Sequence, residues 1–184
     1  MTRTPDAPSR RRFLRRAATF AAAGALPALA MPARAAVPRE LAMVHTHTHE
    51  HIERVFAVGE RYLEPALDAL NRFLRDHYTG DVGVIDPRLF DLMHRVRQTL
   101  GSTGRFEVIS GYRCPATNDR LRSSRAGGVA RRSLHMQGCA IDVRLPGVAL
   151  TDLRDAGLSL RAGGVGYYPR EQFVHLDIGR VRSW

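Results

Sequence analysis

The chain has 184 residues and a formal net charge of +10. All 28 basic residues are arginines, and seven of them lie within the first 35 residues together with one of the 18 acidic residues. The other 149 residues therefore hold 21 basic and 17 acidic groups, which is a modest excess of positive charge. Because the arginines are scattered and no known nucleic-acid-binding module is present, we predict that the chain binds no nucleic acid.

Residues 1–35 are predicted to be an export signal. The run Ser9–Arg15 matches the twin-arginine pattern, and a weakly apolar, alanine-rich segment follows it over residues 17–31. We expect export by the twin-arginine translocation machinery, cleavage after Ala35 and a periplasmic location, with residues 36–184 forming a single domain. An uncleaved anchor is the alternative, but about fifteen residues broken by glycine and proline are too few to span a bilayer comfortably. We therefore expect no stable membrane insertion of the mature chain.

The first elements of the domain are predicted to be two strands of a hairpin, Leu41–Val44 and Ile52–Val58. The connection His45–His51 holds four histidines at alternate positions. Such a pattern could chelate a metal ion from one face of a strand. The simpler interpretation is a polar hairpin that faces solvent, because a strong metal site takes ligands from several directions.

Two helices follow, and further strands and helices come after them. Apolar residues recur at helical spacing over Leu63–Leu74 and over Leu89–Leu100, where Asp86 is placed to cap the helix and Pro87 to occupy its first turn. The remaining predicted elements are a strand over Arg105–Ser110, a short helix opening at Thr117–Asp119, a helix from Thr151 to about Leu160, and strands over Gly163–Tyr168 and Phe173–Asp177. The glycines of Gly163–Tyr168 indicate either close approach of an extended peptide or tight strand packing.

Two segments hold a candidate metal site: residues 133–142, where a turn leads into a predicted strand, and the predicted strand Phe173–Asp177. His135 is followed seven residues later by Asp142, which lies in an apolar run, and His175 lies in a predicted strand where its side chain shares a face with Asp177. A single histidine in an apolar run is usually a hydrogen-bonded core residue. Several imidazole and carboxylate groups between apolar residues are costly to bury unless a cation pairs with them. A catalytic zinc ion needs three such ligands and one open position.

The motif around these residues resembles a known family. Ser133-x-His135-x-x-Gly138-x-Ala140-x-Asp142, together with Ser110-Gly111-Tyr112-Arg113 and the late His175, is similar to the signature of the zinc peptidases that include D-Ala-D-Ala carboxypeptidases, VanX dipeptidases, phage endolysins and the hedgehog fold. The YcbK-like branch, periplasmic murein endopeptidases exported by the twin-arginine route, is similar over nearly all of the mature chain. This resemblance implies an α+β fold with a central antiparallel sheet and helices packed mainly on one face.

The resemblance also implies the roles of individual residues. His135, Asp142 and His175 would bind one zinc ion per chain. Arg113 would hold the substrate's carbonyl or carboxylate group through the N–H donors of its planar guanidinium. Tyr112 and Ser133 would be further substrate-binding residues.

One position departs from the family pattern. VanX-like members place a general-base glutamate three residues before the last histidine, where this chain has Gln172, which cannot take a proton. The role would fall to Asp177 or to Glu171. We favour Asp177 because two residues along a strand keep it on the face of His175, whereas Glu171 follows a predicted loop.

The two cysteines, Cys114 and Cys139, each lie beside a predicted site segment. In an oxidising periplasm such a pair is usually joined, so we predict a disulfide that braces the site from behind. Two free thiols, or Cys139 as a further metal ligand, are the alternatives.

The predicted function is that of a zinc peptidase which hydrolyses stem-peptide cross-links in peptidoglycan, and we expect it to act as a monomer. The modest positive charge fits an anionic polymer of this kind. Two alternatives remain open. The same site could belong to a D,D- or L,D-carboxypeptidase that trims stem peptides, or the domain could be a peptidoglycan binder without catalytic activity.

Overall fold

The computed structural model describes residues 37–124 and 129–184, and the compact unit that contains them spans Ala36–Trp184. The predicted signal peptide lies outside the described residues. Within the described part of the chain, the helices are too short or too polar for any of them to cross a bilayer.

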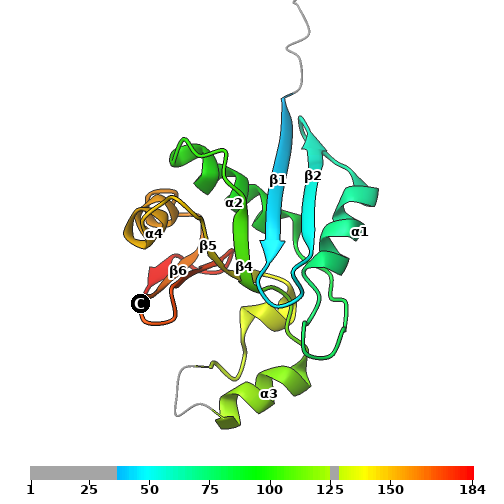
Figure 1. The fold of residues 1–184 in the computed structure, drawn as a ribbon, viewed down its shortest axis with the longest axis vertical. Helices are drawn as coiled ribbons and strands as arrows, with labels where there is room; N and C mark the ends of the chain where they lie inside the picture. Colours follow the sequence, from blue (N-terminus) through cyan, green and yellow to red (C-terminus); the bar gives the residue numbers. More distant parts are fainter. Residues whose placement is uncertain (1–36, 125–128) are drawn as a thin grey trace, which may run out of the picture. The chain divides into compact units, whose positions relative to one another are not determined.

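The unit is built on one eight-stranded sheet with the strand order β3-β2-β1-β4-β5-β7-β6-β8, and Figure 1 shows several of these strands. The strands are β1 (Pro38–His45), β2 (His51–Val58), β3 (Arg61–Tyr62), β4 (Phe106–Ser110), β5 (Ala140–Arg144), β6 (Gly164–Tyr168), β7 (Phe173–Asp177) and β8 (Arg182–Ser183). The strands predicted from the sequence are all present. The prediction of an antiparallel sheet is wrong at two places, because β1 pairs with β4 and β6 pairs with β8 in parallel. A parallel pair requires a long connection, and β2, α1 and α2 supply it between β1 and β4.

Four helices and one short 3-10 helix complete the unit: α1 (Glu64–Phe73), α2 (Pro87–Thr99), α3 (Pro115–Ser124), η1 (Leu134–Gln137) and α4 (Leu150–Ser159). α2 begins as predicted, since the Asp86 side chain accepts a hydrogen bond from the backbone N–H of Arg88 and Pro87 occupies the first turn. α3 begins at Pro115, two residues before the predicted start.

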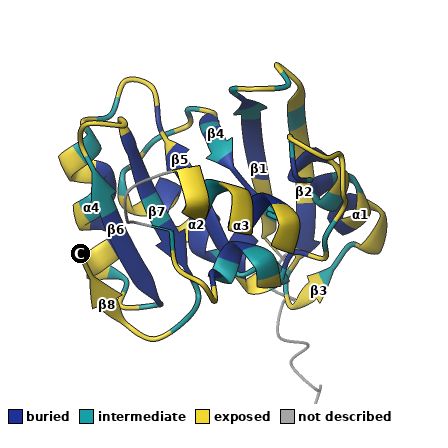
Figure 2. Ribbon diagram, turned by 90° about the horizontal axis from the view of Figure 1, so that it is seen from below, coloured by how far each residue is buried: buried dark blue, intermediate teal, exposed yellow. Residues whose placement is uncertain are grey.

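Three of the helices cover one face of the sheet, as predicted. Leu70 of α1, Phe90 of α2 and Leu153 of α4 belong to a single apolar core together with Ile141 of β5 and Leu176 of β7. Figure 2 shows these strands as mostly buried and the helices as buried on one side only. None of the core residues comes from α3, whose buried side chains are polar.

The opposite face of the sheet carries the polar residues of the predicted site. Along β5, Ile141 and Val143 point into the core, so Asp142 points the other way. The antiparallel register between β5 and β7 places Asp142 directly opposite His175. The sheet therefore brings these two side chains together on the face opposite α1, α2 and α4.

Gly138 fixes the position of η1 on this face. It ends the 3-10 helix with a φ angle of 65°, and its carbonyl oxygen accepts a hydrogen bond from the backbone N–H of Asp86. A Cβ atom at this position would overlap the carbonyl oxygen of Val84. Only glycine allows both the left-handed backbone and this close approach.

We therefore expect Gly138→Ala to destabilise the domain more than Gly147→Ala does. Gly147 also has a positive φ angle, 82°, but a Cβ atom there would meet no atom within 4 Å. The control should cost about 1–2 kcal/mol for the left-handed backbone alone. Gly138→Ala should cost at least about 3 kcal/mol because the backbone must also shift. Urea unfolding at neutral pH measures both, and equal losses would contradict this account.

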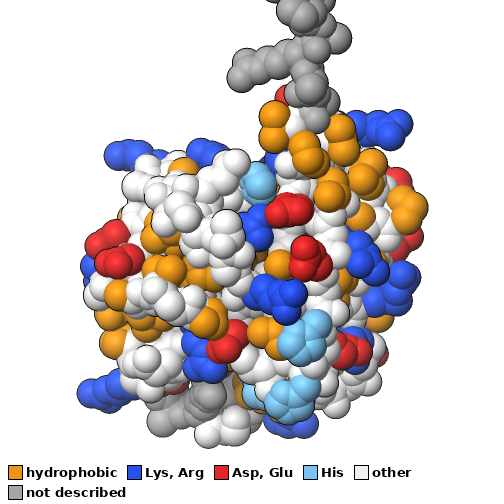
Figure 3. All heavy atoms as spheres, turned by 45° about the horizontal axis from the view of Figure 1, so that its top comes forward, with side chains coloured by type: hydrophobic (Ala, Val, Ile, Leu, Met, Phe, Trp, Pro, Cys, Tyr) orange, Lys and Arg blue, Asp and Glu red, His pale blue; other side chains and the backbone are white. Residues whose placement is uncertain are grey.

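The histidine-rich hairpin forms, but its histidines do not share one face. β1 ends at His45, whose ring is fully buried, and His49 has a φ angle of 58° in the turn that follows. His47, His49 and His51 are exposed, and Figure 3 shows histidine side chains next to arginine and acidic side chains on one face of the molecule. The solvent-facing interpretation is correct for these three residues and wrong for His45. His45 instead packs edge-on against His77, with the ring centroids 5.4 Å apart.

The buried histidine pair stays neutral. Burial lowers the pKa of His45 to about 4, and the neighbouring His77 and His47 add to this effect. Burial and His47 also lower the pKa of His77 to about 4. The Nε2 atoms of both rings are buried without a hydrogen-bond partner. An imidazolium would therefore be poorly accommodated here.

The free energy of unfolding should consequently fall as the pH is lowered from about 6.5 towards 4. In this range the unfolded chain binds protons at histidines with an ordinary pKa of about 6.5, whereas the folded chain does not. The loss attributable to His45 should reach about 3 kcal/mol at most. Urea unfolding at pH 7, 5.5 and 4.5 should give a shallower pH dependence for His45→Asn than for the unsubstituted chain. The exposed control His49→Asn should leave the slope unchanged, and identical slopes for all three proteins would refute the assignment.

Candidate active site

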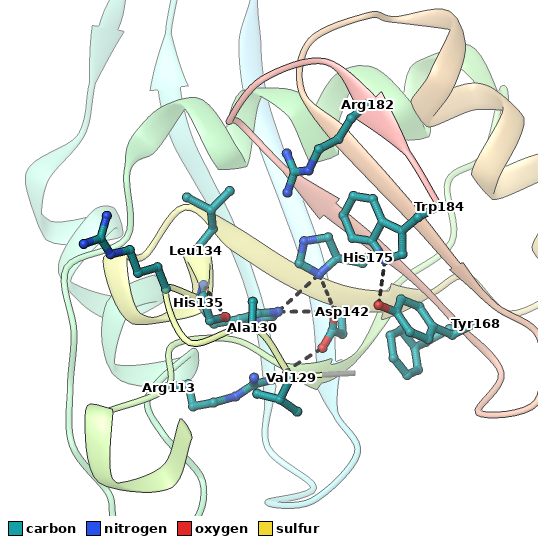
Figure 4. Close-up of a pocket in the computed structure, with 13 residues that line it drawn as sticks. Arg113, Val129, Ala130, Leu134, His135, Asp142, Tyr168, His175, Arg182 and Trp184 are labelled. Carbon is teal, nitrogen blue, oxygen red and sulfur yellow. Dashed lines mark hydrogen bonds and ion pairs between the residues drawn. The ribbon is translucent and has the colours of Figure 1, made fainter. Parts of the chain in front are cut away.

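Three side chains from different elements meet on the face of the sheet opposite α1, α2 and α4. His135 comes from η1, Asp142 from β5 and His175 from β7 (Figure 4). His135 Nε2 lies 3.3 Å from both His175 Nδ1 and Asp142 Oδ1, and His175 Nδ1 lies 2.8 Å from Asp142 Oδ1. No other group of three or more histidine, cysteine or acidic side chains converges in this way within the residues that the structure describes.

Hydrogen bonds on the far side of each ring set the tautomers. The Gly111 carbonyl oxygen lies 2.8 Å from His135 Nδ1, and because a carbonyl oxygen only accepts, Nδ1 carries the proton. Asp177 Oδ2 lies 3.2 Å from His175 Nε2 and fixes the proton of that ring in the same manner. The other nitrogen of each ring therefore faces the Asp142 carboxylate, where it can bind a metal ion through its lone pair once it carries no proton.

This donor set fits a divalent metal ion. Two atoms that each lie about 2.0–2.1 Å from a tetrahedral ion are about 3.3 Å apart, close to the separations found here. His135 is 3% exposed and Asp142 is 6% exposed, so three electron-rich atoms face one another in a site almost closed to water. A cation at their centre would offset the cost of burying them together. The structure thus brings together the three residues predicted as ligands.

The charges of the site couple to one another. Burial by itself would raise the pKa of Asp142, but His135 and His175 hold it well below its usual range. Burial by itself would lower the pKa of His175, but hydrogen bonds and charges from Asp142 and Asp177 raise it to about 9. Without a metal ion, the site therefore favours an ionised Asp142 carboxylate and a protonated His175 ring.

Arg113 lies beside the ligand set, at the position that the sequence predicted. It follows β4, its backbone N–H donates to the His135 carbonyl oxygen, and its side chain is largely buried. Its Nη2 atom lies 3.3 Å from Ser110 Oγ and 3.8 Å from Asp142 Oδ2. The guanidinium is therefore held at the edge of the metal ligands and borders the adjoining cavity.

The cavity next to the three ligands has a volume of about 320 Å³. Three arginines and three aromatic residues contribute to its lining: Arg113, Arg132, Arg182, Tyr168, Phe173 and Trp184. The Trp184 indole N–H donates to the Tyr168 hydroxyl at 2.7 Å, which joins two of the rings (Figure 4). Guanidinium groups and rings suit a peptide that carries carboxylates. Sequence reasoning assigned no role to Arg132, Tyr168, Arg182 or Trp184, because none of them lies in a motif of recognisable chemistry.

Two residues predicted to bind substrate, Tyr112 and Ser133, have contacts within the protein. The Tyr112 ring packs against Gly83 and the core and does not line the cavity. Ser133 does line the cavity, but its hydroxyl accepts a hydrogen bond from the His135 backbone N–H and so caps η1. The structure thus shows packing for Tyr112 and a capping contact for Ser133, which supports the turn that carries His135.

The environment of Asp177 does not suit a general base. The carboxylate is fully buried, and both of its oxygens already accept hydrogen bonds. Burial by itself would raise the pKa of Asp177, but hydrogen bonds from His175, Gly179, Gly164 and Arg182 hold it well below its usual range. Such a group has little tendency to take a proton from water.

Glu171, the other predicted base, is exposed in the turn between β6 and β7. It is not among the residues that line the cavity, and Asp142 is the only carboxylate in that lining. Gly163, just before β6, leaves room for the Asp177 backbone, and Gly164, its first residue, leaves room for the Asp177 side chain. This agrees with the tight-packing interpretation of the segment.

The predicted disulfide is absent from the structure, in which both cysteines are free. The Cys114 thiol is buried and contacts the hydroxyls of Thr79 and Thr117 at 3.8 and 3.5 Å. The Cys139 thiol instead donates to the Gln137 carbonyl oxygen at 3.4 Å. The two side chains serve different local contacts, and neither belongs to the metal ligand set.

Comparison with known proteins gives a consistent result. A family model described as peptidoglycan L,D-endopeptidase MepK matches residues 33–184. The chain is 46% identical to peptidoglycan L,D-endopeptidase MepK of Escherichia coli strain K12 and to that of Shigella flexneri, over 147 residues and 80% of each chain. It is 38% identical to a probable MepK of Haemophilus influenzae over 148 residues, which cover 80% of this chain and 79% of the relative. No solved structure matches the chain. The extent of the family match, together with sequence identity over most of each relative, places this chain in the peptidoglycan L,D-endopeptidase MepK family of the M15-like peptidases.

Proposed function

We propose that this chain is a zinc-dependent murein endopeptidase that hydrolyses stem-peptide cross-links in peptidoglycan. The observation that carries the proposal is the set of three converging donor atoms from His135, Asp142 and His175 beside a cavity lined by Arg113. The names of the family relatives, peptidoglycan L,D-endopeptidases, support the choice of substrate. The helix-covered sheet and the signature around His135 support kinship with the D-Ala-D-Ala carboxypeptidases, VanX and the hedgehog fold.

The location is also part of the proposal. We propose that residues 1–35 are a twin-arginine signal and that residues 36–184 act in the periplasm as a single, monomeric domain. The support is the arginine motif at Ser9–Arg15 and the alanine-rich segment after it.

One zinc ion per chain would be held by His135, Asp142 and His175. When bound, zinc acts as a Lewis acid that polarises a carbonyl group and activates water. The two imidazoles direct their lone pairs inward because Gly111 and Asp177 hold their other nitrogens. Asp142 supplies the negative charge that a dication requires. Arg113 supplies positive charge at the edge of the cavity, where it can stabilise charge that develops on the substrate's carbonyl oxygen.

A general base must accept the proton that the attacking water releases. Asp177 is unsuited to this role because both of its oxygens are occupied. Glu171 is therefore the remaining candidate of the two, and it lies in the turn between Tyr168 and Phe173, which both line the cavity. We propose it as the base on this ground.

The test of the function is digestion of purified muropeptides by the zinc-loaded protein. We expect cross-linked dimers to be converted to monomers, with activity lost on chelation and restored by zinc. His135→Ala should bind no zinc and lose activity at least about 1000-fold. The exposed control His49→Ala should retain both. Trimming of monomers without cleavage of dimers would indicate a carboxypeptidase, and binding to sacculi without any cleavage would indicate a binding domain.

Arg113 offers a second prediction. Arg113→Lys keeps the positive charge but loses the planar set of N–H donors. We therefore expect kcat/KM to fall about 100-fold while the zinc content stays at one ion per chain. Arg120→Lys is the matched control, since Arg120 lies over the Tyr78 ring and does not line the cavity. It should be fully active. Steady-state kinetics on a cross-linked muropeptide measure both, and a fully active Arg113→Lys would exclude a specific role for the guanidinium.

A further inference from the structure

Asp177 occupies a site built to hold a carboxylate behind His175. It is the last residue of β7, two residues after His175, and it is fully buried. Oδ1 accepts hydrogen bonds from the backbone N–H groups of Gly164 and Gly179 at 3.0 and 2.8 Å. Oδ2 lies 3.2 Å from His175 Nε2, on the side of the ring away from the converging donor atoms.

Arg182 completes this site with a bidentate contact to the Asp177 carboxylate. Its Nη1 donates to Asp177 Oδ1 at 3.2 Å and its Nη2 donates to Oδ2 at 2.8 Å. A guanidinium that binds both carboxylate oxygens fixes the plane of the carboxylate as well as its charge. The Asp177 side chain therefore has almost no freedom to turn away from His175.

The backbone around the pair is shaped to admit it. β8 pairs in parallel with β6, and this register sets Arg182 next to Gly164. A Cβ atom on Gly164 would collide with both the Asp177 carboxylate and the Arg182 guanidinium. The Arg182 guanidinium also lies 4.7 Å from the centroid of the Trp184 ring. Figure 4 shows Arg182 and Trp184 beside His175.

We infer that Asp177 and Arg182 are positioning residues that set the metal affinity of the site by orienting His175, and that they take no part in proton transfer. This inference rests on the proposed function, because it concerns the same metal ligands. Carboxylates that accept a hydrogen bond from a ligating histidine typically change metal affinity by 10- to 100-fold when removed. Arg182 extends this arrangement by one residue, since its contacts with both oxygens hold the Asp177 carboxylate in place.

The experiment compares zinc dissociation constants, measured by competition with a chromophoric chelator, in the full chain and four variants. Asp177→Asn and Arg182→Met should bind zinc roughly 10- to 100-fold more weakly. Arg182→Lys, which keeps one charged donor, should lie between Arg182→Met and the unsubstituted chain. Arg180→Met is the matched control, because Arg180 is an exposed arginine two residues away that does not line the cavity. It should bind zinc normally.

Activity at saturating zinc separates this role from catalysis. Positioning predicts that Asp177→Asn, whose side chain does not line the cavity, regains its kcat to within a few-fold once enough zinc is supplied. The absorption spectrum of bound Co²⁺ should change in both Asp177→Asn and Arg182→Met. Because Arg182 also lines the cavity, its variants are judged by zinc affinity and by this spectrum. Arg182 is partly exposed, so its variants should fold even if Asp177→Asn does not. Thermal unfolding of each variant checks this.

Two outcomes would overturn the inference. Unchanged zinc affinity in Arg182→Met and Asp177→Asn would remove the positioning role. Normal affinity with a loss of kcat of about 100-fold or more in Asp177→Asn would make Asp177 the general base after all. If the unsubstituted chain itself bound no zinc, the proposed function would fail together with this inference. That result is distinct from a failure confined to the variants.

Discussion

The candidate site depends on the pairing register of β5 and β7, which buries the Asp142 carboxylate beside an imidazole. Asp142 lies opposite His175 across the β5–β7 pair, and a slip of one residue would move both side chains to the apolar face. The apolar neighbours Ile141 and Leu176 prevent that slip because they fill the core under the helices. The core therefore defines the register, and the register defines the pair of donors on the other face.

The third donor depends on contacts at a distance from the sheet. His135 lies in η1, whose end is held by the close approach of Gly138 to the Val84 carbonyl. The Gly111 carbonyl then sets its tautomer, and Arg113, two residues further on, reaches the edge of the same site. One loop thus orients a ligand and delivers a positive charge. This coupling explains why the Ser110–Arg113 and Ser133–Asp142 motifs belong to one site although they are separated in sequence.

The C-terminal part of the chain contributes Phe173, Arg182 and Trp184 to the lining of the cavity. β8 places Arg182 against Asp177 and Trp184 against Tyr168, so charge and aromatic surface are supplied by one short segment. A cavity bordered by arginines and rings beside a metal-binding set suits an acidic peptide substrate. It agrees with membership of a family whose named relatives cleave peptidoglycan.

The sequence by itself located the elements and pointed to the three side chains that converge in the structure. Apolar spacing located the helices and strands, Asp86 and Pro87 marked the start of α2, and the spacing within one motif marked His135 and Asp142. These features depend on residues close together in the chain, so local pattern reveals them. Tertiary structure alone decided the parallel pairing of β1 with β4, the separate contacts of the two cysteines, the burial of His45 and the environment of Asp177. Each of these depends on which atoms surround a side chain after folding. The face of a strand predicts where Asp177 points, but only the packed neighbours show that both of its oxygens already have hydrogen-bond donors.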